Sequence, residues 1–482
     1  MNVRTVRTVW TGLALLLCLT ALPAAAQPVV RPAAIDLPLV ELPFNATGGF
    51  RAPGMQQSLG VTAGLYEAGH TLLGRVAPRH PWLRNAGITI VDYVTLAVPL
   101  GDAWLHEEWH RAILGRNRVD SRNDVWNLRN IFAEAISVSH VSDEDLVRLK
   151  RDRPRDFVRM KAAGYEGEGE LITRLERDQF FSGSRAWHVG LYWLVALNDQ
   201  LYVGTIVNPA DSAEIDSITN KANQDERTVM GRDASGHDFT AWVYHLFRPD
   251  EPFEARGPHP SGVGLDRYIK VSDLTAEEKR YIERQGKLAW LNFVDPNFIG
   301  VRGISFRNPV NGGAARANLW LRHALTSFGH TVDSHIVFSQ GEFRMHLIAQ
   351  RFTNNARSFP GVRVELLDMP VRVGPHALAL SPRVGLWSQP RDGEFRTRDG
   401  SAGGLLGARI GTRTDGRLQF YVEGEVKSAG WVAGRPSLAR GATFQSGLRY
   451  SLQPAAQRAG ERAGSRAAQR NAQRNAPKPP TN

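Results

Sequence analysis

Cysteine is nearly absent from this chain of 482 residues. Its single copy, Cys18, lies in the first 26 residues, a segment that we expect to be removed. The mature chain would then contain no thiol, which excludes both a disulfide framework and a thiolate metal site. Any metal centre in the mature chain must therefore be built from histidines and carboxylates.

Long hydrophobic runs are also scarce. The first is the uncharged stretch Val9–Ala21, which follows Arg4 and Arg7 and is followed by the small residues Ala24–Ala26. A basic start, a short apolar run and a small-residue cleavage site predict a secretory signal peptide at residues 1–26. We therefore expect an exported protein, located in the periplasm or the outer membrane.

A second apolar stretch, Trp187–Val207, is interrupted by Asn198, Asp199 and Gln200. Three polar residues inside a run favour a buried helix or a re-entrant segment over a simple membrane span. No later run predicts a transmembrane helix. Helices that cross a membrane are therefore not expected in the mature chain.

The formal net charge of +11 is spread unevenly. Residues 451–482 hold six basic residues against one acid and are otherwise rich in Ala, Gln, Asn and Pro. Such a composition cannot bury a core, so we expect a disordered basic tail at 453–482. Because the basicity is concentrated in this tail, it does not predict a nucleic-acid partner.

Between these two ends the sequence predicts three parts. Residues 27–60 are Pro-rich and extended. Residues 61–302 are expected to be mostly helical, with capping signals at Ser142 and Thr275. Residues 303–452 change to a period of two, the pattern of β-strands. The expected fold class is α+β: a mostly helical N-terminal domain followed by an antiparallel, barrel-like β domain.

The alternation is clearest in Leu418–Lys427, where apolar residues and Gly424 alternate with Gln, Tyr, Glu and Lys. Asp415-Gly416, just before it, predicts a hairpin with the strand Leu405–Arg413. Further strands are expected at 315–327, 333–338, 342–351, 362–373, 377–387 and 442–452. Seven or eight strands with short turns are typical of a barrel or a sandwich.

The sequence leaves the environment of this β domain open. Alternating hairpins in an exported chain without cysteine fit an outer-membrane barrel. Such barrels usually end on an aromatic strand residue, whereas this chain continues beyond Tyr450 to Asn482. A barrel inserted in the outer membrane and a soluble β domain are therefore both compatible with the pattern, and the oligomeric state is undetermined.

The most specific chemical motif lies in residues 101–115. Asp102 is a good N-cap and Gly115 a good C-terminal stop, so a helix of about three turns fits between them. His106 and His110 are four residues apart, which places both imidazoles on one face, where they can bind one zinc ion. Glu107 lies about 100° around the helix from His106, close enough for its carboxylate to hold a metal-bound water.

The remaining residues of this helix predict how it packs. Glu108 and Arg111 fall on a far, wet face and are three residues apart, so they can form an ion pair. A core stripe is expected from Leu105, Trp109, Ala112 and Ile113. In the alternative interpretation the two histidines only make hydrogen bonds in the core and Glu107 is an ordinary surface charge.

The pattern His106-Glu107-x-x-His110 resembles that of gluzincin-type zinc metallopeptidases. The resemblance covers this helix and one further glutamate, and Glu108 and Arg111 depart from the uncharged residues that the family usually has there. It implies hydrolysis of peptide bonds in a peptide or protein substrate. It also implies one zinc ion as cofactor, with His106 and His110 as ligands and Glu107 as the catalytic base.

In that family the third ligand is a glutamate from a later helix, and two candidates stand out. Glu166 lies among glycines that permit close backbone approach, ahead of a helix expected at 170–180. The stretch around Glu134 is similar to the N-E-A-x-S-D sequence of thermolysin-like enzymes, with Ala133 in place of Asn and Val138 in place of Asp. Both glutamates are also explained as solvated helix acids. We take Glu166 as the expected third ligand and keep Glu134 as the alternative.

One further histidine is a weaker candidate. His237, in the sequence Ser235-Gly236-His237-Asp238, is a possible donor to the oxyanion of a tetrahedral intermediate. It is equally compatible with a boundary residue that has no chemical role.

Three functions remain open at this point. The first is an envelope zinc metallopeptidase whose β domain serves as an anchor or substrate platform. The second is a non-enzymatic outer-membrane or periplasmic protein with a structural or binding role. The third, a metal-binding protein without turnover, differs from the first only in its lack of activity.

Overall fold

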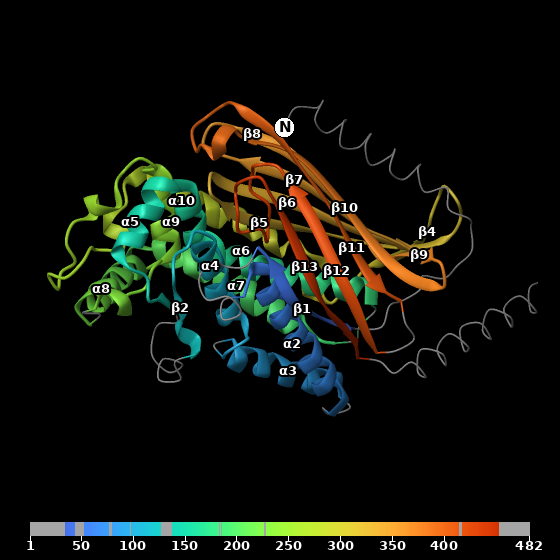
Figure 1. Cartoon of the computed structure of the whole chain (residues 1–482). Helices are drawn as coiled ribbons and strands as arrows, with labels where there is room; N and C mark the ends of the chain where they lie inside the picture. Colours follow the sequence, from blue (N-terminus) through green and yellow to red (C-terminus); the bar gives the residue numbers. More distant parts are fainter. Residues whose placement is uncertain are drawn as a thin grey trace, which may run out of the picture.

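The protein is described from a computed structural model that covers residues 34–43, 53–76, 80–96, 98–126, 137–182, 184, 186–225, 228–413 and 417–452. Four predictions lie outside these residues: the signal peptide, the basic tail at 453–482, Glu134 and the turn at Asp415-Gly416. The described part combines helices with one large antiparallel sheet, which confirms the α+β fold class (Figure 1).

The helices begin before residue 61 and extend through most of the predicted helical region. Their bounds are α2 (Met55–Val76), α3 (Pro81–Thr95), α4 (Asp102–Arg116), α5 (Asp143–Asp152), α6 (Pro154–Ser182), α7 (Val189–Val207), α8 (Pro209–Asp225), α9 (Asp238–Phe247) and α10 (Ala276–Ala289). A two-stranded ribbon, β2 (Arg122–Asn123) with β3 (Val138–Ser139), lies between α4 and α5.

The capping predictions at Ser142 and Thr275 are confirmed. The backbone N–H of Asp145 donates to Ser142 Oγ at 3.1 Å, and α5 begins one residue after that serine. Thr275 and Glu278 form a reciprocal capping box at the start of α10. Each side chain satisfies a backbone donor that the first helical turn leaves free, which is why the sequence signal is reliable.

The apolar stretch around residues 187–207 forms α7, which packs Leu191, Tyr192 and Val195 into the core. The helix is thus confirmed, and one of its faces is buried as predicted. None of the described helices combines the length and the apolar character that a membrane span requires.

The main sheet is antiparallel and contains β1 (Ala34–Leu42), β4 (Ile304–Arg307), β5 (Ala314–Thr326), β6 (Gly329–Gln340), β7 (Phe343–Thr353), β8 (Ser358–Leu366), β9 (Met369–Val373), β10 (His376–Pro390), β11 (Gly400–Thr412), β12 (Leu418–Lys427) and β13 (Gly441–Ser451). The strand order is β1-β13-β12-β11-β10-β8-β7-β6-β5-β4, with β9 paired to β10. The predicted pairing of the strands around residues 405–413 and 418–427 is confirmed, with Leu405 opposite Lys427.

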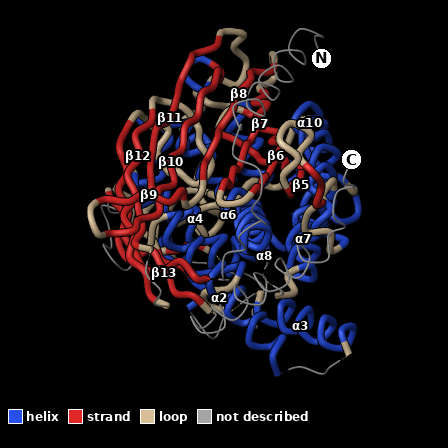
Figure 2. The backbone as a smooth tube through the Cα atoms, turned by 90° about the vertical axis from the view of Figure 1, so that its right-hand side faces the viewer, coloured by secondary structure: helices blue, strands red, loops and turns tan. Residues whose placement is uncertain are grey.

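The expectation of a barrel is wrong for these strands. β1 and β4 are the two ends of the strand order and do not pair with each other, so the sheet is open. Figure 2 shows the reason: the sheet curves around α4 and α6, and helices occupy the side that the lumen of a closed barrel would fill. An open edge leaves backbone donors and acceptors without sheet partners, a problem that a closed barrel does not have.

The segment expected to be merely extended, residues 27–60, contributes more than predicted. Its residues 34–42 form β1, which pairs with β13 from the other end of the chain, with Ile35 opposite Tyr450. Gly60 and Gly64 of α2 let this helix lie on the strand, because a Cβ at either glycine would be 2.5 Å from a side chain of β1. The two ends of the described chain are thereby tied together.

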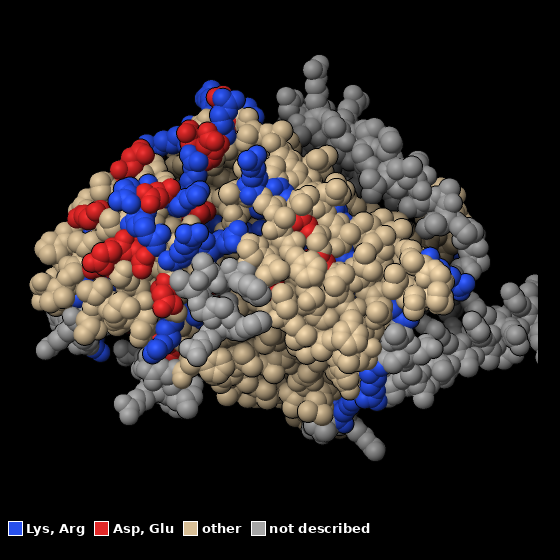
Figure 3. Space-filling model, viewed as in Figure 1, with Lys and Arg blue, Asp and Glu red and all other residues tan. Residues whose placement is uncertain are grey.

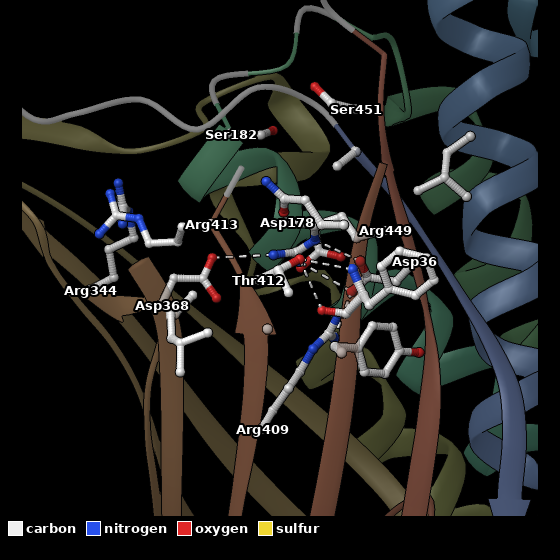
Figure 4. A pocket seen from close by; sticks show the side chains of 18 of the residues that line it. Asp36, Asp178, Ser182, Arg344, Asp368, Arg409, Thr412, Arg413, Arg449 and Ser451 are labelled. Atoms are coloured by element: carbon white, nitrogen blue, oxygen red, sulfur yellow. Dashed lines mark hydrogen bonds and ion pairs between the residues drawn. The ribbon is translucent and has the colours of Figure 1, made fainter. Parts of the chain in front are cut away.

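The sheet face that is turned toward α6, here called the inner face, is strongly charged. A cavity of about 590 Å³ lies between it and α2 and α6. Asp36 in its wall accepts hydrogen bonds from Arg409 at 2.8 Å, Arg449 at 2.7 Å and Arg174 at 3.2 Å (Figure 4). Burial alone would raise the pKa of Asp36, but the three arginines hold it well below its usual value. The chain therefore supplies its own counter-charges on this face.

Candidate metal centre

The predicted motif helix is confirmed as α4, and it is buried almost all round. Its predicted ends are wrong, because Gly101 rather than Asp102 is the N-cap and the helix continues through Gly115 to Arg116. Its predicted core stripe is confirmed, since Leu105, Trp109, Ala112 and Ile113 are each fully buried. The predicted ion pair between Arg111 and Glu108 forms at 2.6 Å, but the wet face is wrong because Glu108 is only 1% exposed. Asn123 from the small ribbon covers that face and donates to Glu108 at 2.9 Å.

Two glycines of α6 bring the helices α4 and α6 into close contact. A Cβ at Gly164 would lie 2.2 Å from His106 Nε2, and one at Gly167 would lie 2.9 Å from the ring of Trp109. Glycines three residues apart lie on the same side of a helix. They form a shallow groove into which His106 fits, so the glycines noted in the sequence position a histidine rather than Glu166.

His106, His110 and Asp238 offer ligand atoms that all lie within 4.8 Å of one another. The Nε2 atom of His106 is 2.9 Å from Asp238 Oδ2, and the Nε2 atom of His110 is 3.3 Å from the same oxygen. Asp238 is the first residue of α9, so a carboxylate from a distant segment joins the two imidazoles of α4. This is the only such cluster of three in the described residues.

The opposite nitrogen of each ring is also occupied. His106 Nδ1 lies 2.8 Å from Glu168 Oε1, and His110 Nδ1 lies 2.5 Å from the carbonyl oxygen of Met160. A carbonyl oxygen can only accept, so His110 Nδ1 carries a proton and a neutral ring has its lone pair on Nε2. Partners of this kind fix the tautomer and orientation of histidines that bind metals.

The contacts of both rings therefore direct nitrogen lone pairs toward the carboxylate of Asp238. Lone pairs and an anionic oxygen repel one another unless a cation lies between them. That cation is either a proton or a metal ion. The buried atoms His110 Nε2 and Asp238 Oδ1 have no hydrogen-bond partner, which fits positions that a cation would occupy.

Without a metal, protons supply the positive charge. Burial opposes a charge on His106, but Glu168 and Asp238 outweigh it and hold the pKa of this imidazole well above its usual value. Burial likewise opposes a charge on Asp238, but His110 and His106 hold the pKa of its carboxyl far below the usual range. The metal-free centre is thus expected to contain an imidazolium and an ionised aspartate.

A layer of buried acids lies behind His106. Burial raises the pKa values of the Asp102 and Asp199 carboxyls well above the usual value, and the charge of Glu168 raises both further. Asp102 and Asp199 therefore tend to be protonated.

Glu107 is buried beside this cluster, with 7% of its surface exposed. Burial raises the pKa of its carboxyl well above the usual value, His106 opposes this, and the acids Asp233 and Asp238 raise it further. A carboxyl with a raised pKa suits a general base that works near neutral pH. The prediction of Glu107 as the base therefore stays compatible with the site.

Glu166 does not join the histidines, and its prediction as third ligand is wrong. Its carboxylate accepts from Arg159 at 2.6 Å and from the backbone N–H of Gly434 at 2.9 Å. It lies in the middle of α6, where residues two apart point about 200° away from each other. Glu168 therefore faces His106, whereas Glu166 faces the opposite side. The alternative, Glu134, lies outside the described residues.

His237 adjoins the cluster through the sequence. Its ring stacks on Tyr202, with centroids 4.1 Å apart, and neither ring nitrogen has a hydrogen-bond partner. Burial lowers the pKa of His237 to about 4, so the ring is neutral and can donate one hydrogen bond. His237 was predictable as a candidate from the sequence, whereas its neighbour Asp238 was missed. The available signal was the acid at the start of the largely apolar helix α9.

No known family model matches this chain, and no curated protein or solved structure is significantly similar to it. The chemistry of the site is therefore inferred from its own atoms. Two imidazoles and one carboxylate form the kind of three-ligand set that protein zinc sites use when the fourth position is left for water or substrate.

Proposed function

We propose that this chain is an exported zinc-dependent metallopeptidase in which His106, His110 and Asp238 hold the ion. The observation that carries the proposal is the convergence of two imidazole nitrogens and one carboxylate, each ring oriented from behind by Glu168 or by the Met160 carbonyl. Structural ion pairs do not need such an arrangement of acceptors. The arrangement supports a metal site, because the ligand atoms and the groups that orient them are in place before an ion binds.

A bound zinc ion would supply a Lewis acid that lowers the pKa of water and polarises a carbonyl group. The other tasks belong to the chain. Glu107 accepts the proton from the attacking water and returns it to the leaving amine, for which its raised pKa is suited. The neutral ring of His237 is positioned next to Asp238 in the sequence and donates to the developing oxyanion.

The proposed substrate is a peptide or protein of the periplasm or outer membrane. Its reaction is hydrolysis of a peptide bond, in which water adds to the carbonyl carbon and the C–N bond breaks. The signal peptide predicted at residues 1–26 supports this location. The non-enzymatic alternative shares the location and predicts a folded chain that holds no metal.

The test is the metal content and peptidase activity of the purified mature chain. We expect one zinc ion per chain and cleavage of a denatured protein substrate. His106→Ala should lose both the zinc and the activity, whereas Glu107→Gln should keep the zinc and lose about 10²- to 10⁴-fold in kcat. His376→Ala and Glu277→Gln replace exposed residues of the same types and serve as matched controls.

Each alternative gives a different outcome. A folded chain without zinc, unchanged when zinc is added, contradicts the proposal and supports the structural or binding role. A chain that binds one zinc ion but cleaves no peptide contradicts the peptidase function and supports metal binding without turnover.

A further inference from the structure

The sheet face that is turned away from the helices carries apolar side chains at its exposed positions. In β12 the outward residues Leu418, Phe420, Val422 and Val426 are 45%, 60%, 46% and 54% exposed. The register extends this pattern sideways, because Val426 lies opposite Leu406 of β11, which in turn lies opposite Val384 of β10. We call the outward side chains of β8 and β10–β13 the outer face.

The outer face holds no Asp, Glu, Lys or Arg in the described residues of these five strands. Figure 3 agrees: charged side chains crowd the region over the helices, and few of those drawn lie over strands β10–β13. Exposed apolar patches of this extent are rare on soluble monomers and mark an interaction surface.

The inner side of the same strands shows the reverse pattern. Alternating with the apolar residues of β12 are Glu423 and Glu425, which are buried and paired with Arg383 and Arg435. A sheet packed on helices in water normally buries its apolar face and exposes its polar one. Here the polarity is inverted, as it is when hydrocarbon rather than water surrounds the outer side.

We propose that the outer face lies against the hydrocarbon layer of an anionic lipid membrane. The lack of charge across five strands favours lipid over a second copy of this chain, because protein interfaces carry polar rims and several hydrogen bonds. The dimensions also fit. β12 has ten residues, about 33 Å in length, and strands in membranes need about 9–11 residues.

Three arginines lie at one end of the sheet, beyond the uncharged outer face, and suit anionic headgroups; one of them, Arg413, also pairs with Glu342 at 3.4 Å. Arg372, Arg413 and Arg417 lie at the ends of β9, β11 and β12 that meet there. Arg417 donates to the hydroxyl of Tyr450 at 3.2 Å, and tyrosine is favoured where hydrocarbon meets headgroups. Basic side chains at such a position are attracted to anionic lipid surfaces.

Helix α3 supplies an independent second apolar surface near this end. α2 precedes it, and Arg75 in the last turn of α2 donates to the carbonyl oxygen of Leu452, next to the end of β13. On α3 six large apolar side chains are exposed: Trp82, Leu83, Ile90, Val91, Tyr93 and Val94. α3 exposes Trp and Tyr and buries one side through Ile88 and Asp92. Such a helix suits the membrane interface.

The open sheet limits how the contact is made. Backbone groups at an unpaired edge are very unfavourable in hydrocarbon, so the edge strand β4 and the outer edge of β1 must stay outside it. Contact through one face satisfies this condition, since the middle strands β10–β12 each have sheet partners on both sides. The proposal does not depend on the metal centre or on the proposed peptidase activity.

The test is co-flotation of the full mature chain with vesicles of phosphatidylethanolamine and phosphatidylglycerol. We expect the wild type to float, and Leu406→Asp/Val422→Asp to reduce the bound fraction at least about tenfold, because charges on a lipid-facing position are strongly disfavoured. Ile299→Asp replaces an apolar residue of the helical part that is 77% exposed, and this matched control should float like the wild type. Circular dichroism checks that each variant is folded.

A second measurement applies if the double variant does not fold. The mature chain is expected to lack cysteine, so Val422→Cys and Ile299→Cys can each be labelled with one polarity-sensitive dye. The emission at position 422 should shift to the blue on vesicles, and that at position 299 should not. Wild type that never floats, or no shift at 422, overturns the proposal. A wild-type dimer that Leu406→Asp/Val422→Asp converts to a monomer, without flotation, overturns it in favour of a second copy.

Discussion

The inner face of the sheet and the metal centre are both buried and charged, but they balance their charges differently. On the inner face Asp36 contacts three arginines, and Glu425 pairs with Arg435 at 2.5 Å. At the metal centre Asp238 has two imidazoles and, among the described residues, no ion pair with arginine or lysine.

The difference indicates which cluster is structural and which is open to a ligand. A buried carboxylate surrounded by guanidinium groups has no need of another cation. A buried carboxylate that shares its site with nitrogen lone pairs requires a proton or a metal ion. The same distinction separates Glu166, which binds Arg159, from Glu168, which contacts His106.

The largest expected effect separates the two clusters directly. Asp238→Asn should lower the affinity for zinc by more than about 1,000-fold, since it removes the anionic ligand, and should leave the metal-free fold intact. Asp36→Asn should leave zinc binding unchanged and destabilise the chain by about 3–5 kcal/mol, because buried arginines lose their counter-charge. Zinc titration and urea unfolding measure the two effects. The exposed pair member Asp399 provides the control variant Asp399→Asn. Equal zinc affinity in Asp238→Asn and wild type would contradict the proposal that Asp238 is a zinc ligand.

Zinc should stabilise the folded chain through the cluster of His106, His110 and Asp238, which has no ion pair with arginine or lysine among the described residues. At a free concentration 100 times the dissociation constant, zinc should raise the free energy of unfolding by about 2.7 kcal/mol. A chelator should reverse this, and Asp238→Asn should show no response. Thermal unfolding with and without zinc measures the effect. A similar zinc-dependent gain in Asp238→Asn would place the ion elsewhere.

Glu166 and Glu168 of α6 provide a finer comparison. Glu168→Gln should weaken zinc binding about 10- to 100-fold, because it removes the acceptor that orients His106. Glu166→Gln should leave zinc affinity unchanged and lower the melting temperature, since Arg159 remains buried without its partner. If Glu166→Gln weakens zinc binding and Glu168→Gln does not, the prediction of Glu166 as the third ligand is restored.

The smallest expected effect is a pH dependence that arises from the inner face. The pKa of Asp36 is lower in the folded chain than the value of 3.8 for the free side chain. Its contribution to stability is therefore fully present above about pH 4 and is lost as the pH falls through the folded value. Urea unfolding of the metal-free chain between pH 6 and 3 should show a steeper loss for wild type than for Asp36→Asn. Parallel curves would exclude this contribution.

Local signals predicted the elements well. The capping residues Ser142 and Thr275 mark helix starts because they satisfy backbone groups a few residues away. The alternation in Leu418–Lys427 correctly predicted which residues share a face, because side chains in a strand alternate by geometry. The motif helix with His106 and His110 was likewise predictable from spacing alone.

Predictions that depended on distant segments were less successful. Asp238 is 128 residues after His110, and nothing in the sequence of α4 or α9 shows that they meet. The wet face assigned to Glu108 failed for the same reason, since a ribbon from another segment covers it. The sheet failed to close because helices occupy its concave side.

By itself the sequence determined the α+β class, the helix that aligns two imidazoles and the strands whose apolar and charged residues alternate. These features depend on interactions within a few residues, so the local pattern is sufficient. Only the tertiary structure decided that Asp238 rather than Glu166 completes the cluster, that the charged side of the sheet faces inward and that the sheet stays open. These outcomes depend on which distant segments pack together, and that is set by the packing and charge balance of the whole chain.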